Sequence, residues 1–207
     1  KSVTMNERPG IFRKWRTSSV RLVSLFLLLV LTTTFYSPLL ALDCDPMIVA
    51  LNTQAEVDSF QDTYGPCDRV LSLYIEGADI SNLGGLSELT DVGSSLYIQN
   101  NPMLDNTAGL SALTHVSRNL WIQNNDSLTS LEGLWALTTV DHLLAIFEND
   151  ALTDVDGLTA LRAVGGSLVI RDNALLSNLD DLSALTSVAG AERADQRFLH
   201  IENNPAL

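Results

Sequence analysis

The chain has 207 residues, with 12 basic and 25 acidic side chains and a formal net charge of −13 at pH 7. Six basic residues and one acidic residue precede Leu42, which leaves six basic and 24 acidic residues, a net charge of −18 and no lysine. Nucleic acids and anionic lipids bind proteins through positive patches, which this composition does not supply. We therefore expect no nucleic-acid partner and no membrane insertion of the mature domain.

The N-terminal segment, residues 1–41, has the three parts of a secretory signal peptide. Basic residues follow the expected start at Met5, then a ten-residue apolar run spans 22–31, and Ala41 marks the expected cleavage point. An uncleaved membrane anchor is the alternative, although ten strongly apolar residues are fewer than the roughly 20 that cross a bilayer. The segment predicts a secreted or cell-surface protein.

Residues 42–70 predict a disulfide-closed N-terminal cap. Thr53 and Glu56 have the spacing of a capping box, which marks the start of a helix. Cys44 and Cys67 are the two cysteines of the chain, and an even count in an exported protein favours a disulfide bond. Such a bridge would contribute about 3 kcal/mol by restricting the unfolded chain. A metal or redox pair is the weaker alternative, because neither a nearby histidine nor a CxxC motif supports it.

A repeated phrase, Leu-x-Ile, recurs through residues 71–207. Its leading leucines are 23, 24, 24, 24 and 31 residues apart: Leu73, Leu96, Leu120, Leu144, Leu168 and Leu199. A fixed period in this range indicates a solenoid, in which each repeat is one rung stacked on the next. Side chains alternate along a strand, so the Leu and Ile of each phrase point into the core together. The sequence predicts a mainly β fold, a parallel β-solenoid of about 24-residue leucine-rich rungs with a short capping helix.

An asparagine recurs five residues after most of the strand leucines. The set is Asn101, Asn125, Asn149, Asn173 and Asn204, whereas Ala78 takes this place in the first rung. Stacked amides at a bend can bond one another and the backbone groups that a tight turn leaves unpaired. A row of ligands for a bound molecule is the alternative. We favour a structural asparagine ladder, because the asparagines recur with the inward period.

Strand residues between and after each inward pair are predicted to face solvent. The candidate binding residues among them are Tyr74, Tyr97, Trp121, Phe147 and Arg171. Exposed aromatic side chains on a rigid sheet can stack on sugar rings or anchor a protein partner. The alternative is that a loop or another segment of the chain covers them.

The last rung is irregular, since residues 189–198 make it about seven residues longer than the others. Insertions in repeats map to surface loops, which either carry recognition or are neutral. The sequence ends one third of the way into a further rung, so we expect the solenoid to be truncated at its C-terminus.

Catalytic residues cannot be nominated from this sequence, so we expect a protein that is not an enzyme and needs no cofactor. The three histidines occupy different places in different rungs, and no Ser or Cys nucleophile has a matched base. A calcium role for acids near the bends is an alternative. However, Asp126, Asp150 and Asp172 do not match a known calcium-loop spacing, so no metal site is predicted.

The repeat best seen at residues 157–173, Gly-Leu-x-x-Leu-Thr-x-Val-Gly-Gly-x-Leu-x-Ile-x-x-Asn, resembles the receptor L-domain type of leucine-rich repeat. The segment from Cys44 to Cys67 is similar to the opening of the bacterial cell-surface group with such repeats. The resemblance covers residues 44–207 and implies a right-handed parallel β-solenoid. Thr107, Asp181 and the insertion at 189–195 depart from the pattern. The resemblance transfers no ligand contacts, because one fold serves many partners.

These observations together predict a noncatalytic extracellular or cell-surface module for binding or adhesion. Its flat repeat surface would be presented to an unidentified protein or carbohydrate ligand at the cell surface. Two alternatives remain open: a structural spacer for a downstream domain, and the noncatalytic part of a larger secreted enzyme.

Overall fold

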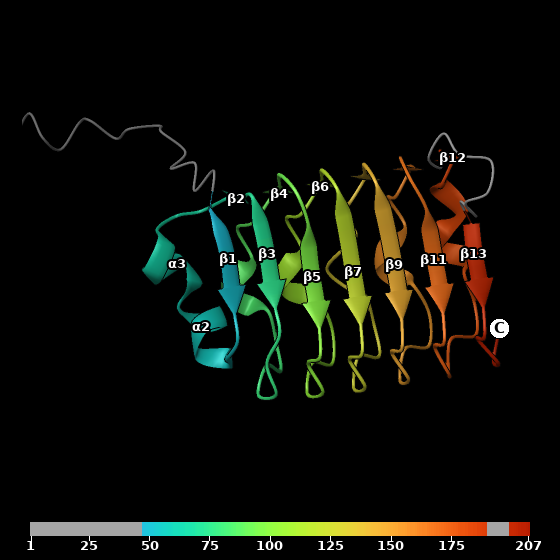
Figure 1. The fold of residues 1–207 in the computed structure, drawn as a ribbon, viewed down its shortest axis with the longest axis horizontal. Helices are drawn as coiled ribbons and strands as arrows, with labels where there is room; N and C mark the ends of the chain where they lie inside the picture. Colours follow the sequence, from blue (N-terminus) through green and yellow to red (C-terminus); the bar gives the residue numbers. More distant parts are fainter. Residues whose placement is uncertain (1–46, 190–198) are drawn as a thin grey trace, which may run out of the picture. The chain divides into compact units, whose positions relative to one another are not determined.

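The computed structural model describes residues 47–189 and 199–207, and this part of the chain is mainly β. The predicted signal peptide, Cys44 and most of the insertion lie outside the described residues. Seven parallel strands form the larger sheet in the order in which they occur along the chain (Figure 1). They are β1 (Ile48–Leu51), β3 (Ser72–Ile75), β5 (Leu96–Gln99), β7 (Asn119–Gln123), β9 (Leu143–Phe147), β11 (Leu168–Arg171) and β13 (Leu199–Glu202).

A second parallel sheet has six strands of two residues each, and sequence analysis did not predict it. The strands are β2 (Arg69–Val70), β4 (Asp91–Val92), β6 (His115–Val116), β8 (Thr139–Val140), β10 (Ala163–Val164) and β12 (Ser187–Val188). The chain alternates between the two sheets, so each rung adds one strand to each of them. The arrangement is that of a parallel β-solenoid.

Four rungs contain a short 3₁₀ helix between their long and short strands. These helices are η1 (Gly84–Leu86), η2 (Ala108–Leu110), η3 (Asp156–Leu158) and η4 (Asp180–Ala184). The first three each bury a leucine in the same core, such as Leu86 in η1 or Leu110 in η2, and Leu182 of η4 packs against that core while partly buried. The Gly-Leu of the closing motif therefore forms a third, helical side of the rung.

The strand register places equivalent residues of successive repeats side by side. Leu73 pairs with Leu96, and Leu96 with Leu120. Leu168 pairs with Leu199 although 31 residues separate them, so the insertion leaves the register unchanged. This alignment turns a sequence period into columns of identical side chains.

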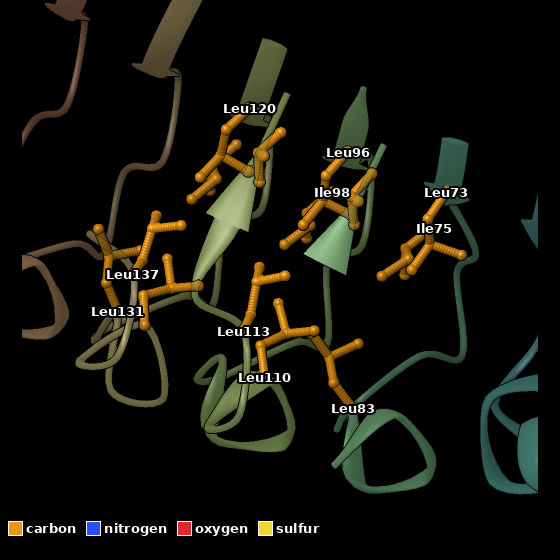
Figure 2. Close-up of a cluster of buried hydrophobic side chains, with 14 of the residues drawn as sticks. Leu73, Ile75, Leu83, Leu96, Ile98, Leu110, Leu113, Leu120, Leu131 and Leu137 are labelled. Carbon is orange, nitrogen blue, oxygen red and sulfur yellow. The ribbon is translucent and has the colours of Figure 1, made fainter. Parts of the chain in front are cut away.

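Columns of aliphatic side chains fill the interior between the sheets. Figure 2 shows leucines and isoleucines of neighbouring rungs packed in rows, and the ten labelled residues are essentially inaccessible to solvent. Full burial of such a side chain contributes about 1.5–3 kcal/mol.

Thr107 takes one of these inward positions, and its hydroxyl donates a hydrogen bond to the carbonyl oxygen of Glu132 at 2.9 Å. The polar substitution in this rung is thereby compensated.

The N-terminal end is covered by two short helices, α2 (Gln54–Asp58) and α3 (Phe60–Tyr64). The predicted capping box is present, because the Thr53 hydroxyl accepts from the Glu56 N–H and the Glu56 carboxylate accepts from the Thr53 N–H. Val57 and Phe60 point into the core and are fully buried. The helices contact η1, so they cover the first aliphatic rung.

The sheet begins one strand earlier than expected, because β1 lies within the predicted cap segment. Val49 and Leu51 are buried and pair with Leu73 and Ile75, as a Leu-x-Ile phrase would. The signal was present in the sequence as Val49-Ala-Leu51, but its aliphatic residues differ from those of the repeated phrase.

The first asparagine position is also shifted by one residue from the prediction. Gly77, rather than Ala78, donates its N–H to the Asn101 side-chain oxygen at 2.9 Å, as the ladder asparagines of later rungs do to their neighbours. The bend in this rung is one residue shorter, which explains the 23-residue spacing from Leu73 to Leu96. A side chain at Gly77 would collide with the carbonyl oxygen of Asn52, since its Cβ would lie 2.2 Å away.

Candidate binding face

Aromatic side chains form a stacked column on the outward face of the seven-stranded sheet. Tyr74 and Tyr97 are nearly parallel, with ring centroids 4.7 Å apart and an interplanar angle of 8°. Trp121 continues the column, at 6.3 Å and 22° from Tyr97. The spacing follows from the register, because neighbouring strands lie about 4.8 Å apart.

Beyond Trp121 the column departs from the predicted pattern. Phe147 and Ala145 were both expected to face solvent, but they are only 8% and 2% exposed. Ala145 occupies the column position beside Trp121, and its small side chain leaves space for the Phe147 ring. Phe147 meets Trp121 edge-on at 5.7 Å, and the guanidinium carbon of Arg171 lies 4.4 Å from the centre of the phenyl ring. Phe147 is therefore part of the packing and not a free contact residue.

The stacking determines which parts of the rings a ligand could reach. Tyr97 is enclosed between Tyr74 and Trp121, so both faces of its ring are occupied by other rings. Stacking of a sugar on these inner ring faces is thus blocked. The column presents ring edges along its length, and within the described residues no ring stacks on the face of Tyr74 toward β1.

A polar row runs beside the aromatic column. The Glu76 carboxylate accepts hydrogen bonds from Gln99 Nε2 at 2.8 Å and from Asn100 Nδ2 at 2.7 Å. These bonds hold the pKa of Glu76 below its usual value, although slight burial acts in the opposite direction. Glu76 therefore stays ionised near neutral pH and places a negative charge beside the column.

One buried donor of the column has no partner within the described residues. The indole N–H of Trp121 is inaccessible to solvent and makes no hydrogen bond there. Buried indole donors usually find an acceptor, and leaving one unsatisfied costs about 1–3 kcal/mol. The stacking of the Trp121 ring on Tyr97 fixes the indole N–H in this buried position.

The asparagines at the bends form a continuous ladder behind this face. The Asn125 side chain donates to the Ile98 carbonyl oxygen at 3.0 Å and to Asn149 Oδ1 at 3.1 Å, and its own Oδ1 accepts from the side chain and backbone of Asn101. The same contacts recur at Asn101, Asn149 and Asn173. Asn204 accepts from Asn173 and donates to the Ile170 carbonyl oxygen, and it is the last described member of the ladder. All but Asn204 are fully buried, which leaves their amides inaccessible to a ligand.

The residue before each ladder asparagine has a left-handed backbone conformation. These residues are Asn100, Asn124, Glu148, Asp172 and Asn203, with φ between 52° and 56°. Asn and Asp tolerate this region better than other non-glycine residues, so four of the five choices suit the turn. The bend geometry thus explains the Asn, Asp or Glu that comes directly before each ladder asparagine.

A charged cluster that sequence analysis missed lies on the six-stranded sheet. His115 Nδ1 lies 3.0 Å from Asp91 Oδ2, and His115 Nε2 lies 2.9 Å from Asp141 Oδ2. Arg69 Nε is 3.1 Å from the other oxygen of Asp91. Arg69, Asp91 and His115 follow one another at 22 and 24 residues, close to the repeat length. This spacing could have revealed the charged cluster, had the short second strand of each rung been recognised.

This cluster predicts a pH-dependent contribution to stability. Burial lowers the pKa of His115, but hydrogen bonds and charge interactions with Asp91 and Asp141 outweigh it and raise the pKa above 6.5. The stabilisation is fully present below pH 6.5 and is lost as the pH rises through the raised value. It should stay below about 1 kcal/mol, since these groups are partly solvated.

Thermal unfolding of the wild type and of His115→Gln at about pH 5.5 and about pH 8.5 would measure this contribution. We expect the stability difference between the two proteins to shrink at the higher pH. A difference that is constant or grows with pH would contradict the assignment.

Other chemistry is limited in the part of the chain that the structure describes. No group of three or more His, Cys, Asp or Glu side chains there is arranged to hold a metal ion. Within residues 47–189 and 199–207, no helix is both long and apolar enough to traverse a bilayer.

No protein-family model, curated protein or solved structure matches this chain.

Proposed function

We propose that this chain is a noncatalytic extracellular module for binding or adhesion, built from leucine-rich repeats of the receptor L-domain type. The resemblance of the repeat phrase supports the repeat type, together with the pairing of each Leu-x-Ile with the next. A secreted or cell-surface location and a Cys44–Cys67 disulfide bond are part of the same proposal, and they rest on the sequence alone. The partner is a protein or a carbohydrate.

The observation that carries the proposal is the aromatic column on the outward face of the seven-stranded sheet. The ring edges of Tyr74, Tyr97 and Trp121 lie on three adjacent strands, β3, β5 and β7. The buried Phe147 ring and Arg171 continue the packed column to β11. Aromatic and arginine side chains on rigid elements are the residues that dominate binding energy at interfaces. Backbone hydrogen bonds fix the strands, and ring stacking restricts the tyrosine and tryptophan side chains, so little entropy is lost when a partner binds.

Replacement of Trp121 by alanine should weaken binding of a cognate partner at least tenfold while the protein remains folded. The ring lies at the centre of the column, and its loss removes both contact area and the support of Tyr97. The measurement is a screen of the full chain on glycan arrays and surface-protein arrays, followed by titration of each hit.

Trp135→Ala is the matched control, because Trp135 is 48% exposed in a turn that is not part of either sheet. It should bind hits as the wild type does. Equal affinity of the wild type and a folded Trp121→Ala variant would refute the role of the column.

A structural spacer is the second candidate, and the self-stacked rings favour it. Ring faces that contact one another stabilise the sheet without any ligand, at about 0.5–1.5 kcal/mol for each pair. A spacer predicts that Trp121→Ala lowers the unfolding temperature while no array ligand binds the wild type.

A further inference from the structure

The two ends of the aromatic column differ in how they are covered. At the C-terminal end, the guanidinium of Arg171 lies over the Phe147 ring and pairs with the Asp172 carboxylate. Its Nη1 is also 3.9 Å from Glu148 Oε1. The chain itself therefore covers this end with an arginine that is held between an aromatic ring and acidic groups.

At the N-terminal end the corresponding cover is absent among the described residues. Tyr97 occupies one face of Tyr74, and the other face points toward β1, where the register places Ala50 beside it. The side chain of Ala50 ends at Cβ, so it leaves the space of one flat group above β1. Tyr74 is 38% exposed, and Ile48, which lies on β1 two residues before Ala50, is 64% exposed.

Charge around this open end favours a cation. Glu76 lies just beyond the end of β3, two residues after Tyr74, and its carboxylate, held by Gln99 and Asn100, is ionised near neutral pH. The chain after residue 41 has six basic against 24 acidic residues, a net charge of −18. A planar cation would be attracted both by the electron-rich face of the Tyr74 ring and by the negative charge of the surrounding surface.

We infer that the open face of Tyr74 binds an arginine side chain of a protein partner. The guanidinium stacks flat on Tyr74 above Ala50, its aliphatic stem contacts Ile48, and Glu76 attracts its charge. Arginine fits better than lysine, because a guanidinium is planar, is weakly hydrated and stacks on aromatic faces. The inference rests on the proposed binding function and names the partner's chemistry: a protein with an exposed arginine.

Titration of the full chain with a capped Gly-Arg-Gly peptide tests the inference, with Gly-citrulline-Gly as the neutral isostere and Gly-Lys-Gly as the point charge. NMR signals of the Ala50 methyl group and the Tyr74 ring report on the site directly. We expect saturable shifts with the arginine peptide and at least about fivefold weaker binding of the other two, because an exposed cation–π contact is modest.

Two variants alter the site in opposite ways. Ala50→Phe fills the open space with a ring of the chain's own, and Tyr74→Leu removes the ring on which the guanidinium stacks. Both should abolish the arginine-specific response. Ala174→Phe adds the same ring at an exposed turn position away from the sheets. In this control, the arginine peptide should shift the Ala50 and Tyr74 signals as it does in the wild type.

The outcomes separate this inference from the proposed function. Equal responses to arginine and citrulline, or a response that persists in folded Ala50→Phe, would overturn the arginine site. If an array partner binds Ala50→Phe and the wild type equally, the proposed binding function stands, but the arginine site on Tyr74 is refuted. A partner that loses affinity for Ala50→Phe, and whose arginine is required, supports both.

Discussion

Asn125→Ala should lower the free energy of unfolding by roughly 3–5 kcal/mol, because it interrupts the asparagine ladder between Asn101 and Asn149. The substitution removes the donors to the Ile98 carbonyl and to Asn149, and the acceptor of the Asn101 backbone and side chain. All these groups are buried, and each that is left unpaired costs about 1–3 kcal/mol. Chemical denaturation of the wild type and the variant measures the difference.

Two further variants isolate the hydrogen bonds. Asn125→Leu keeps most of the volume but none of the polar contacts, so it should be as damaging as the alanine variant. Asn124→Gly removes the adjacent exposed amide and suits its left-handed φ of 52°, so it should change stability little. The ladder would not be a main source of stability if Asn125→Ala proved as mild as Asn124→Gly.

Gly157→Ala should destabilise the protein by about 3 kcal/mol, at the upper end of the usual cost of overpacking. A Cβ at this position would lie 1.8 Å from the carbonyl oxygen of Leu131 in the preceding rung. The obstacle is backbone that belongs to a packed rung, so neither rung can move without disturbing its neighbours. Thermal and denaturant unfolding would both register the loss.

Gly93→Ala is the matched control for this substitution. The nearest atom to a Cβ at Gly93 is the Val70 carbonyl oxygen, at an ordinary contact distance of 3.7 Å. We expect a change within about 0.5 kcal/mol, as for most surface substitutions. If the two alanine variants were equally stable, close stacking of the rungs would not explain the glycine in the Gly-Leu motif.

The parallel rungs could be predicted from sequence because one phrase recurs at one period. Burial of Leu73, Leu96 and Leu120 in one column follows directly from that period and from strand alternation. The second sheet could not be recognised, because strands of two residues carry no alternation of their own. The 23-residue spacing from Leu73 to Leu96 showed that one residue is missing from this rung, but the shift from Ala78 to Gly77 could be placed only once the register was known.

The chemistry of the binding face was less accessible to sequence reasoning. The sequence placed Tyr74, Tyr97 and Trp121 on one side of the sheet, but it did not reveal that their rings stack on one another. Phe147 was assigned to solvent because strand alternation ignores the size of neighbouring side chains. The small side chain of Ala145 decides that outcome through packing between adjacent rungs.

The direction of the ladder hydrogen bonds gives the solenoid an electrical polarity. In each amide from Asn101 to Asn173, one N–H donates to the asparagine oxygen of the next rung, toward β13, while the other donates to an isoleucine carbonyl of the preceding rung. The amide oxygens accept from the rung before, so the chain of amide-to-amide bonds runs in one direction, with its oxygens toward β1. Amide dipoles aligned head to tail add, as they do along a helix axis, and polarise one another. The β1 end of this column therefore carries partial negative charge, and the β13 end carries partial positive charge.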